Sequence, residues 1–406
     1  MNTSIGMIAH DFTGAMDSLA AFVEVPGDTV LLLAAGEPAD SARNVAVVAE
    51  TQTSGPAEAY ALVRNATRRL AGRQLFARVS SSLRGNIGPE VRAVIDETGA
   101  KAIVCSALPR EGRTVIDGVG KLNSVPLHLT EYGRDPVAPC LESSLPVILQ
   151  DSGVEASLIS LASVREGKDA LRETLLATTS EAIVIDAETD DDMQAIGWAL
   201  AALDTRWCAC ATSGLSPHLA AALGRTGDTQ RYRLSQPNKR GVLAVIGSTD
   251  PTSAAQVARL EGLPSSSVVR IEATALCAGG EALLKWEDEA LETLARGNNT
   301  VLTTSLSPVI PHLVGEVAPR LGELASHIIR RRASTLVLSG GLTALNTCRA
   351  LGIEAVEVLG EVEPGVVCSR GTDRYGTDRT IVSKAGGFGV ERTLARVIGT
   401  DERLEP

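Results

Sequence analysis

Two carboxylates flank a turn near the N-terminus, in the segment HDFTGAMD at residues 10–17. The turn directly follows an apolar run, Ile5–Ala9, that predicts a strand. Asp11 would leave the end of this strand, and Asp17 would lie on the first turn of the next helix. Carboxylates in these positions could orient a substrate hydroxyl, and Asp11 could act as a general base. Either acid could instead simply cap the helix.

A second polar turn combines hydroxyl groups with arginines, in RVSSSLRGN at residues 78–86. It ends the predicted strand Leu75–Val79 and leads into a helix that should begin at Ile87. Side chains that could contact a substrate are Ser81, Ser82, Arg84 and Asn86. A guanidinium binds a carboxylate or phosphate with two parallel hydrogen bonds, and a helix start adds free N–H donors. A capping role explains one serine but not the arginines, so the pattern favours an anion site.

Three glycine-bearing turns follow predicted strands in the second half of the chain: GST at 247–249, SGGLTA at 339–344 and KAGGFG at 384–389. Paired glycines let backbone amides approach a phosphate, and a helix start adds the positive end of its dipole. Any one turn could be a plain chain reversal, but several on one sheet predict a nucleotide site. Its expected members are Ser248, Gly340, Gly341, Thr343, Gly386 and Gly387.

Several other chemistries lack their sequence signals. The chain contains no G-x-x-x-x-G-K-[ST] segment, no His or Cys spacing typical of zinc and no G-x-S-x-G nucleophile turn. A nicotinamide-dependent oxidoreductase would share an α/β pattern, but no G-x-G-x-x-G follows the first strand of either half. The sequence leaves the residues of any metal site unknown.

The elements that must position these turns are short apolar runs alternating with segments of helical period, a pattern typical of parallel α/β domains. Ligands bind at the carboxyl ends of strands in such sheets. Expected strands are Ile5–Ala9, Thr29–Ala34, Ala46–Ala49, Leu75–Val79, Ala102–Cys105, Ala182–Ile185, Val242–Ile246, Val268–Ile271, Thr300–Thr303, Thr335–Leu338, Ala355–Val358 and Thr380–Val382. Expected helices include Pro56–Leu70, Ile87–Thr98, Pro251–Leu260, Pro311–Arg332 and Thr343–Leu351.

The length of 406 residues favours two domains. A polar, non-periodic stretch at 224–240 predicts the linker, so the domains should span 1–228 and 240–400. The stretch Leu108–Pro146 is rich in Pro, Gly and Arg and shows no clean period. A segment that long without regular structure is typical of a functional loop.

The net charge of −11 argues against a nucleic acid or an anionic membrane surface as the main partner. The sequence contains no run of about 18 apolar residues and no signal-peptide pattern at its start. Its seven cysteines, an odd number, fit reduced thiols, and Cys208 and Cys210 are interpreted as small buried side chains. These features predict a cytoplasmic protein.

Taken together, the motifs resemble the four-carbon acid sugar kinase family over nearly the whole chain. The segments that carry the resemblance are IAHDFTGAMDS, RVSSSLRGNIGPE, PREGRTVIDG, VPLHLTEYGRDPVAP, VIGSTDPTS, LSGGLTA, LGEVEPGV and SKAGGFG, in family order and at family spacing. The resemblance implies two α/β domains, each with a largely parallel sheet. The N-terminal domain would bind the acid sugar, the C-terminal domain would bind ATP with Mg²⁺, and transfer would occur in the cleft between them.

Carried over onto this sequence, the family's sugar-side residues are Asp11, Asp17, Ser81, Ser82 and Arg84, with Asp11 and Arg84 as the catalytic candidates. The nucleotide-side residues are the six named above. Three positions at which the family has an acid carry His10, Ser80 and Leu342 here, and the family's basic stretch after the third strand is ETQTS at 50–54. One interpretation is a kinase with a shifted substrate, which would be a different or a more anionic molecule. The other is a catalytically weak relative that binds ligands or regulates a partner. The preserved glycines and the SLRGN segment favour the kinase. The sequence does not decide which sugar acid is used or whether the chain forms a homodimer.

Overall fold

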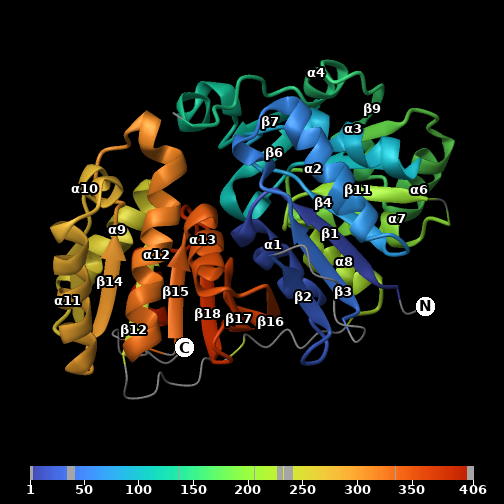
Figure 1. Ribbon diagram of the computed structural model, residues 1–406. Helices are drawn as coiled ribbons and strands as arrows, with labels where there is room; N and C mark the ends of the chain where they lie inside the picture. Colours follow the sequence, from blue (N-terminus) through green and yellow to red (C-terminus); the bar gives the residue numbers. More distant parts are fainter. Residues whose placement is uncertain are drawn as a thin grey trace. The chain divides into compact units, whose positions relative to one another are not determined.

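A computed structural model of the chain describes residues 3–33, 42–135, 137–204, 206–225, 232, 241–333 and 335–399. Its residues form two compact units (Figure 1). The first unit comprises Met1–Thr29 and Pro38–Thr229, and the second comprises Val30–Glu37 and Gln230–Pro406. Both are α/β units built on largely parallel sheets, which confirms the predicted fold class. Most of the expected linker at 224–240 lies outside the described residues.

The first unit is built on a parallel sheet with strand order β3-β1-β4-β11-β5-β10-β9. The strands are β1 Ile5–Ala9, β3 Asn44–Val48, β4 Gln74–Arg78, β5 Lys101–Cys105, β9 Ala156–Ile159, β10 Ala182–Ile185 and β11 Trp207–Ala211. Ala9 at the end of β1 pairs with Arg78 at the end of β4. The turns that begin at His10 and Val79 therefore emerge side by side at the carboxyl edge.

Two strands of this sheet were not expected from the sequence. β11, with the sequence WCACA, is fully buried between β4 and β5, which confirms that Cys208 and Cys210 are small buried side chains. Alanine and cysteine give little strand signal because they are not β-branched. The edge strand β9 mixes polar and apolar residues, and its burial is only partial.

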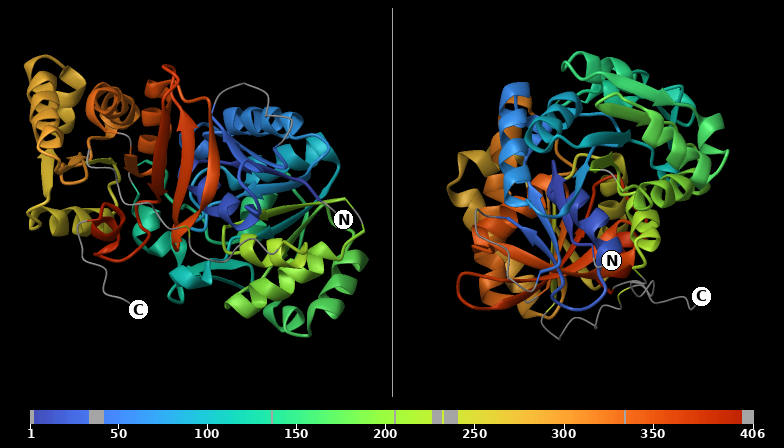
Figure 2. Two further views of the ribbon diagram at one scale, coloured as in Figure 1. Left: turned by 90° about the horizontal axis from the view of Figure 1, so that it is seen from below. Right: turned by 90° about the vertical axis from the view of Figure 1, so that its right-hand side faces the viewer.

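Helices of the first unit form two groups, α2-α3-α4 and α1-α8-α7-α6, with contacts within each group. Figure 2 shows the cyan and green helices on opposite sides of this unit's strands. The helices are α1 Phe12–Leu19, α2 Pro56–Arg69, α3 Ile87–Thr98, α4 Leu145–Gln150, α5 Leu161–Val164, α6 Lys168–Ala177, α7 Asp190–Ala201 and α8 Ser216–Ala222. Short 3₁₀ turns are η1 Ala20–Phe22, η2 Thr51–Thr53, η3 Pro109–Glu111, η4 Leu127–Leu129 and η5 Glu131–Arg134.

The stretch Leu108–Pro146 was expected to be a loop without regular structure, and this expectation was wrong. It contains a small antiparallel sheet of β6 Arg113–Ile116, β7 Val119–Leu122 and β8 Val125–Pro126. Two-residue turns join these strands, and both residues of each turn have positive φ: Asp117 and Gly118 (57° and 73°), then Asn123 and Ser124 (47° and 71°). Asp-Gly is a strong signal for such a hairpin, but strands of two to four residues give too little alternation to detect.

The second unit has strand order β13-β14-β12-β15-β18-β17-β16-β2. Neighbours are parallel as far as β18, and β17, β16 and β2 continue the sheet in antiparallel fashion. The strands are β2 Thr29–Leu32, β12 Val242–Ile246, β13 Ser266–Arg270, β14 Asn299–Thr303, β15 Thr335–Ser339, β16 Ala355–Glu363, β17 Val366–Thr372 and β18 Asp378–Lys384. β17 was not expected from the sequence. β2 belongs to the second unit, although it lies within residues 1–228, which were expected to form the first domain.

Helices of the second unit also form two groups, α10 to α13 and the pair α9 with α14. They are α9 Pro251–Glu261, α10 Ala273–Ala278, α11 Glu281–Ala295, α12 Val314–Arg332, α13 Gly341–Leu351 and α14 Thr393–Val397, with a 3₁₀ turn η6 at Pro311–Leu313. Residues of α9 and α14 pack on β12, β15 and β18 to form a buried apolar core. Among the described helices of the chain, none is long and apolar enough to cross a membrane.

Candidate functional site

The turn after β1 brings His10 and Asp11 against Arg78 of β4. Asp11 is the N-cap of α1: one carboxylate oxygen accepts from the Gly14 N–H at 3.1 Å, and the other accepts from the Thr13 hydroxyl at 2.8 Å. Arg78 Nη1 lies 3.7 Å from Asp11 Oδ1. Asp11 therefore caps α1 and also lies at the carboxyl edge of the sheet. Asp17 lies on the second turn of α1, one turn later than expected.

Burial lowers the pKa of His10 to about 3, and the charge of Arg78 adds to this effect. The His10 ring is therefore neutral near neutral pH. Nε2 contacts Arg78 Nη1, and because a guanidinium only donates, Nε2 must accept and the ring proton lies on Nδ1. Burial alone would raise the pKa of Asp11, but interactions with His10 and Arg78 and the bonds from Thr13 and Gly14 hold it below its usual value. Asp11 is thus ionised near neutral pH.

Gly14 allows this arrangement because it has no side chain. A Cβ at Gly14 would overlap Asp11 Oδ1 and lie 2.5 Å from Arg78 Cζ. The first turn of α1 can therefore approach the guanidinium only with glycine at this position.

The serine turn after β4 forms a second polar group. Ser81 and Ser82 are buried, the Ser80 and Ser82 hydroxyls are 3.0 Å apart, and Arg84 Nε donates to Ser82 Oγ at 3.0 Å. Arg84 also forms an ion pair with Asp135. Leu83 has a φ of 52°, which is strained for a branched side chain. This conformation turns the chain sharply between the serines and Arg84.

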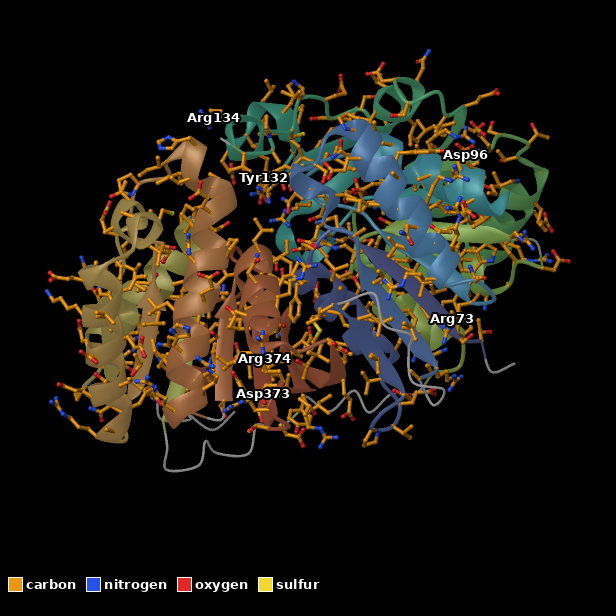
Figure 3. All side chains as sticks on the ribbon, in the orientation of Figure 1. Arg73, Asp96, Tyr132, Arg134, Asp373 and Arg374 are labelled. Atoms are coloured by element: carbon orange, nitrogen blue, oxygen red, sulfur yellow. The ribbon has the colours of Figure 1, made fainter. Side chains whose placement is uncertain are left out.

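Arg113 and Tyr132 join this group from the small sheet and from η5, and neither was singled out from the sequence. Arg113 Nη1 donates to Ser81 Oγ at 2.8 Å, and Nη2 donates to the Tyr132 hydroxyl at 2.6 Å. The guanidinium carbons of Arg84 and Arg113 lie 5.7 and 5.1 Å from the centre of the Tyr132 ring. Figure 3 labels Tyr132 and Arg134 on this segment. The sequence signals were the functional loop expected at Leu108–Pro146 and the two family-like segments within it, PREGRTVIDG and VPLHLTEYGRDPVAP, which contain Arg113 and Tyr132.

Asp17 and Asn86 are engaged by other parts of the first unit. The Asp17 carboxylate is buried and accepts from Arg110 Nη2 at 2.9 and 3.0 Å. The Asn86 amide donates to the carbonyl oxygens of Thr51 and Ser54 at 2.7 and 2.8 Å. Both side chains therefore hold neighbouring turns in place.

Glu90 of α3 is a buried acid that the sequence did not reveal as part of this site. It lines a small cavity together with His10, Thr51 and Arg78, and it accepts a hydrogen bond from the Thr51 hydroxyl. Burial raises the pKa of Glu90 to about 7, against smaller opposing effects of Thr51 and Arg78.

In the second unit the three glycine-bearing turns meet at one sheet edge. β12, β15 and β18 are neighbours, and their ends pair in register as Ile246 with Ser339 and Ser339 with Lys384. A Cβ on Gly386 would overlap Ser248 Oγ, and one on Gly340 would lie 3.3 Å from the Ser248 nitrogen. The expected members Ser248, Gly340 and Gly386 are thus brought together.

Thr343 and Gly387 extend this cradle, and Gly341 is the first residue of α13. A Cβ on Gly247 would overlap the Thr343 hydroxyl, and one on Gly387 would lie 2.8 Å from Asp250 Oδ2. Asp250, which the sequence did not single out, caps α9 by accepting from the Thr252 N–H at 2.9 Å. Glycine at these positions therefore lets the three turns pack closely against one another at the strand ends.

The loop after β18 is stabilised by Lys384, the last residue of that strand, whose side chain is almost fully buried. Its Nζ donates to the carbonyl oxygens of Ala385, Gly386 and Phe388 at 2.9, 2.9 and 3.1 Å. Because C=O and the next N–H point in opposite directions in a trans peptide, the N–H groups of Gly386 and Gly387 point away from Lys384. Burial lowers the pKa of Lys384 to about 8.

Comparison with known proteins agrees with this division. A family model described as "Sugar-binding N-terminal domain" matches residues 5–219, and one described as "Nucleotide-binding C-terminal domain" matches residues 243–394. A D-threonate kinase of Bordetella bronchiseptica is 31% identical over 97% of this chain and 96% of its own length. A D-erythronate kinase of Heliobacterium modesticaldum is 27% identical over 95% of this chain and 94% of its own length. A solved Haemophilus influenzae structure shares the fold, with a TM-score of 0.72 at 20% identity over 97% of this chain and 99% of that one.

Fold and sites define an α/β protein with a sugar-binding N-terminal domain and a nucleotide-binding C-terminal domain. The chain belongs to the four-carbon acid sugar kinase family. It is therefore a phosphotransferase of the class that uses an alcohol group as acceptor.

Proposed function

We propose that this chain transfers the γ-phosphoryl group of ATP to a hydroxyl of a four-carbon sugar acid or a closely related hydroxy-acid. The observation that carries the proposal is the tight cradle of Ser248, Gly340 and Gly386 at the strand ends of the second unit. The arginine and serine group of the first unit supports an anionic second substrate. Relatives of the same length that are named threonate, erythronate and 3-oxo-tetronate kinases support the substrate class.

In the first unit, Asp11 is the proposed general base. Its carboxylate is ionised near neutral pH, so it can accept a hydrogen bond and then the proton from the attacking hydroxyl. Arg84 is proposed to bind and orient the acid, with the hydroxyls of Ser81 and Ser82. Asp17 and Asn86 are proposed to act on the substrate side as positioning residues, through their bonds to Arg110 and to the Thr51 and Ser54 carbonyls.

In the second unit, the amides of Gly340, Gly341, Gly386 and Gly387 and the hydroxyls of Ser248 and Thr343 are proposed to bind the phosphates of ATP. Mg²⁺ commonly binds through one or two carboxylates and substrate phosphates, and it neutralises phosphate charge. Asp250 is the carboxylate beside Gly387 that would fit this role. The described residues contain no cluster of three or more His, Cys, Asp or Glu side chains for a metal, which fits an ion held largely by the nucleotide.

A catalytically weak, ligand-binding member of the family is the second candidate. Leu342 favours it, because this exposed apolar side chain occupies the position at which the family has an acid. The kinase proposal is tested by ATP consumption with Mg²⁺ against threonate, erythronate and their keto forms. Turnover with one of these acids supports the kinase. ATP binding without turnover of any acid supports the second candidate.

Asp11→Asn is expected to lower kcat by about 10²- to 10⁴-fold, because an amide cannot accept the proton. The fold should survive, since Asn caps helices as well as Asp and keeps the acceptor for the Gly14 N–H. Stability should nevertheless fall, because the buried Arg78 guanidinium loses its carboxylate partner. Steady-state kinetics and thermal unfolding of the same preparations measure both effects. Asp151→Asn, at an exposed carboxylate of the same unit, is the control. An unchanged kcat in Asp11→Asn would rule out Asp11 as the base.

A further inference from the structure

We propose that Arg113 receives the carboxylate of the sugar acid and sets the preference of the first unit for acids over uncharged polyols. This inference rests on the proposed function and refines it: Arg113 would bind the carboxylate of the acid, and Arg84, which is paired with Asp135, would help to orient the rest of the substrate.

Other arginines of this group each have a carboxylate partner. Arg78 lies 3.7 Å from Asp11, and Arg110 lies 2.9 Å from Asp17. Arg84 is paired with Asp135. The charges of these guanidinium groups are therefore already balanced within the protein. An incoming anion would have to share each guanidinium with the carboxylate that it already contacts.

Arg113 differs because, within the described part of the chain, it contacts no carboxylate. Its two hydrogen-bond partners are the hydroxyls of Ser81 and Tyr132, which carry no charge. A guanidinium has five N–H donors, and these bonds use two of them. Nε of Arg113 is buried and has no hydrogen-bond partner among the described residues. A half-buried guanidinium that has no carboxylate partner and further N–H donors is the arrangement that a ligand carboxylate completes.

The position of Arg113 suits a small bifunctional substrate. Ser81, its partner, follows β4, while Asp11 follows the neighbouring strand β1 in register. A carboxylate bound by Arg113 would thus lie near one strand end, and a hydroxyl could face Asp11 at the next. The Tyr132 ring lies against both Arg84 and Arg113, so it fixes the spacing of the two guanidinium groups.

A purely structural role is the competing explanation, in which Arg113 only ties β6 to the serine turn and to Tyr132. Loss of a structural contact would disturb the whole site, so it would weaken the binding of charged and uncharged ligands by the same factor. Loss of a carboxylate receptor would weaken only the acid. A comparison between a sugar acid and its uncharged amide therefore separates the two roles.

The test measures KM, kcat and direct calorimetric binding for the best four-carbon acid and for its amide, in wild type, Arg113→Gln, Arg113→Lys and Arg134→Gln. Arg113→Gln should raise KM and Kd for the acid by about 10- to 100-fold and leave the weak binding of the amide unchanged. Arg113→Lys should recover part of the loss, because it restores the charge without the planar fork. Arg134→Gln removes an exposed arginine of the same segment and should have no effect.

Equal weakening of acid and amide in Arg113→Gln, or unchanged acid binding, would overturn the proposal while the kinase function stands. If Arg113→Gln does not fold, the acid-to-amide ratio in Arg113→Lys decides, with an unchanged ratio counting against the proposal. If the wild-type chain neither binds nor phosphorylates any four-carbon acid, the proposed function and this inference both fail.

Discussion

Glu90 places a carboxyl group in the cavity that His10, Thr51 and Arg78 also line. Burial raises its pKa to about 7 from an ordinary value of 4.5. Between these two pH values the native chain keeps a proton that the unfolded chain has released. The contribution of Glu90 to stability is therefore fully present below about pH 4.5 and is lost as the pH rises through about 7.

His10 acts in the opposite sense, because burial lowers its pKa from 6.5 to about 3. Its contribution is present above about pH 6.5 and is lost as the pH falls toward 3. A titration of the wild type alone would mix the two effects. Comparison with Glu90→Gln separates them, since glutamine keeps an acceptor for Thr51 but does not titrate.

We expect the stability of Glu90→Gln relative to wild type to increase by on the order of a few kcal/mol between pH 4.5 and 7.5 and then to level off. Urea unfolding at a series of pH values measures this difference. Arg78 and the His10 ring are the other charged or titratable groups facing the cavity, and both are unchanged in the variant. Parallel stability profiles of the two proteins would contradict a protonated Glu90.

Individual site residues were predictable where a turn follows a recognisable strand. Asp11, Ser81 and Ser82 lie where the sequence expected them, because β1 and β4 are apolar runs with clear ends. Arg113 and Glu90 were missed for a physical reason. Both lie in segments that resemble the family, but their roles arise from tertiary contacts with Ser81 and Thr51, more than 30 residues away in each case, which a local pattern does not encode.

At the scale of elements, the loop after β18 shows how buried side chains shape a binding surface. Lys384, Ser253 and Gln256 donate to carbonyl oxygens of the loop: Ser253 to Gly386 at 2.9 Å, and Gln256 to Phe388 at 3.2 Å. All three side chains are buried, so the loop carbonyls that they bind point toward the protein interior. The loop thereby presents the Gly386 and Gly387 amides in a fixed arrangement before a ligand binds.

We expect Lys384→Met to raise the Kd for ATP about 10-fold or more, because methionine fills the space without holding the carbonyls. Calorimetric titration with ATP measures the effect, and hydrogen exchange of the loop amides should become faster in the unliganded variant. Lys285→Met, at an exposed lysine of α11, is the matched control. Unchanged ATP affinity together with unchanged exchange would show that Lys384 does not order the loop.

Elements were predictable in proportion to the strength of their local signal. The strands β1, β10 and β12 and the helix α3 have the bounds expected from the sequence, because the strands are uninterrupted apolar runs and the helix follows a regular helical period. β17, with the sequence VVCSRGT, was missed because its polar residues interrupt the apolar run. It is stabilised instead by antiparallel pairing with both β16 and β18, which depends on the rest of the sheet.

At the scale of the whole molecule, the two units are not two consecutive pieces of sequence. β2, from the N-terminal part of the chain, pairs with β16 through Val30, Leu31 and Leu32, and the Leu33 N–H donates to the Glu354 carbonyl at 2.8 Å. Leu31, Leu32 and Leu33 are buried. No pattern in residues 29–34 indicates a partner strand more than 300 residues away, so the sequence could not reveal the pairing of β2 with β16.

The second unit should consequently be incomplete without β2. We expect a fragment of residues 232–406 to be less stable than the same fragment carrying residues 29–33 through a flexible linker. Each buried leucine contributes roughly 1.5–3 kcal/mol, and the strand also covers the edge of β16. Urea unfolding and binding of a hydrophobic dye measure stability and exposed apolar surface. A linked fragment with Leu31→Ser and Leu32→Ser controls for the linker and should behave like the fragment without β2. If all three fragments unfold at the same urea concentration, β2 is dispensable, and the second unit would fold from residues 232–406 alone.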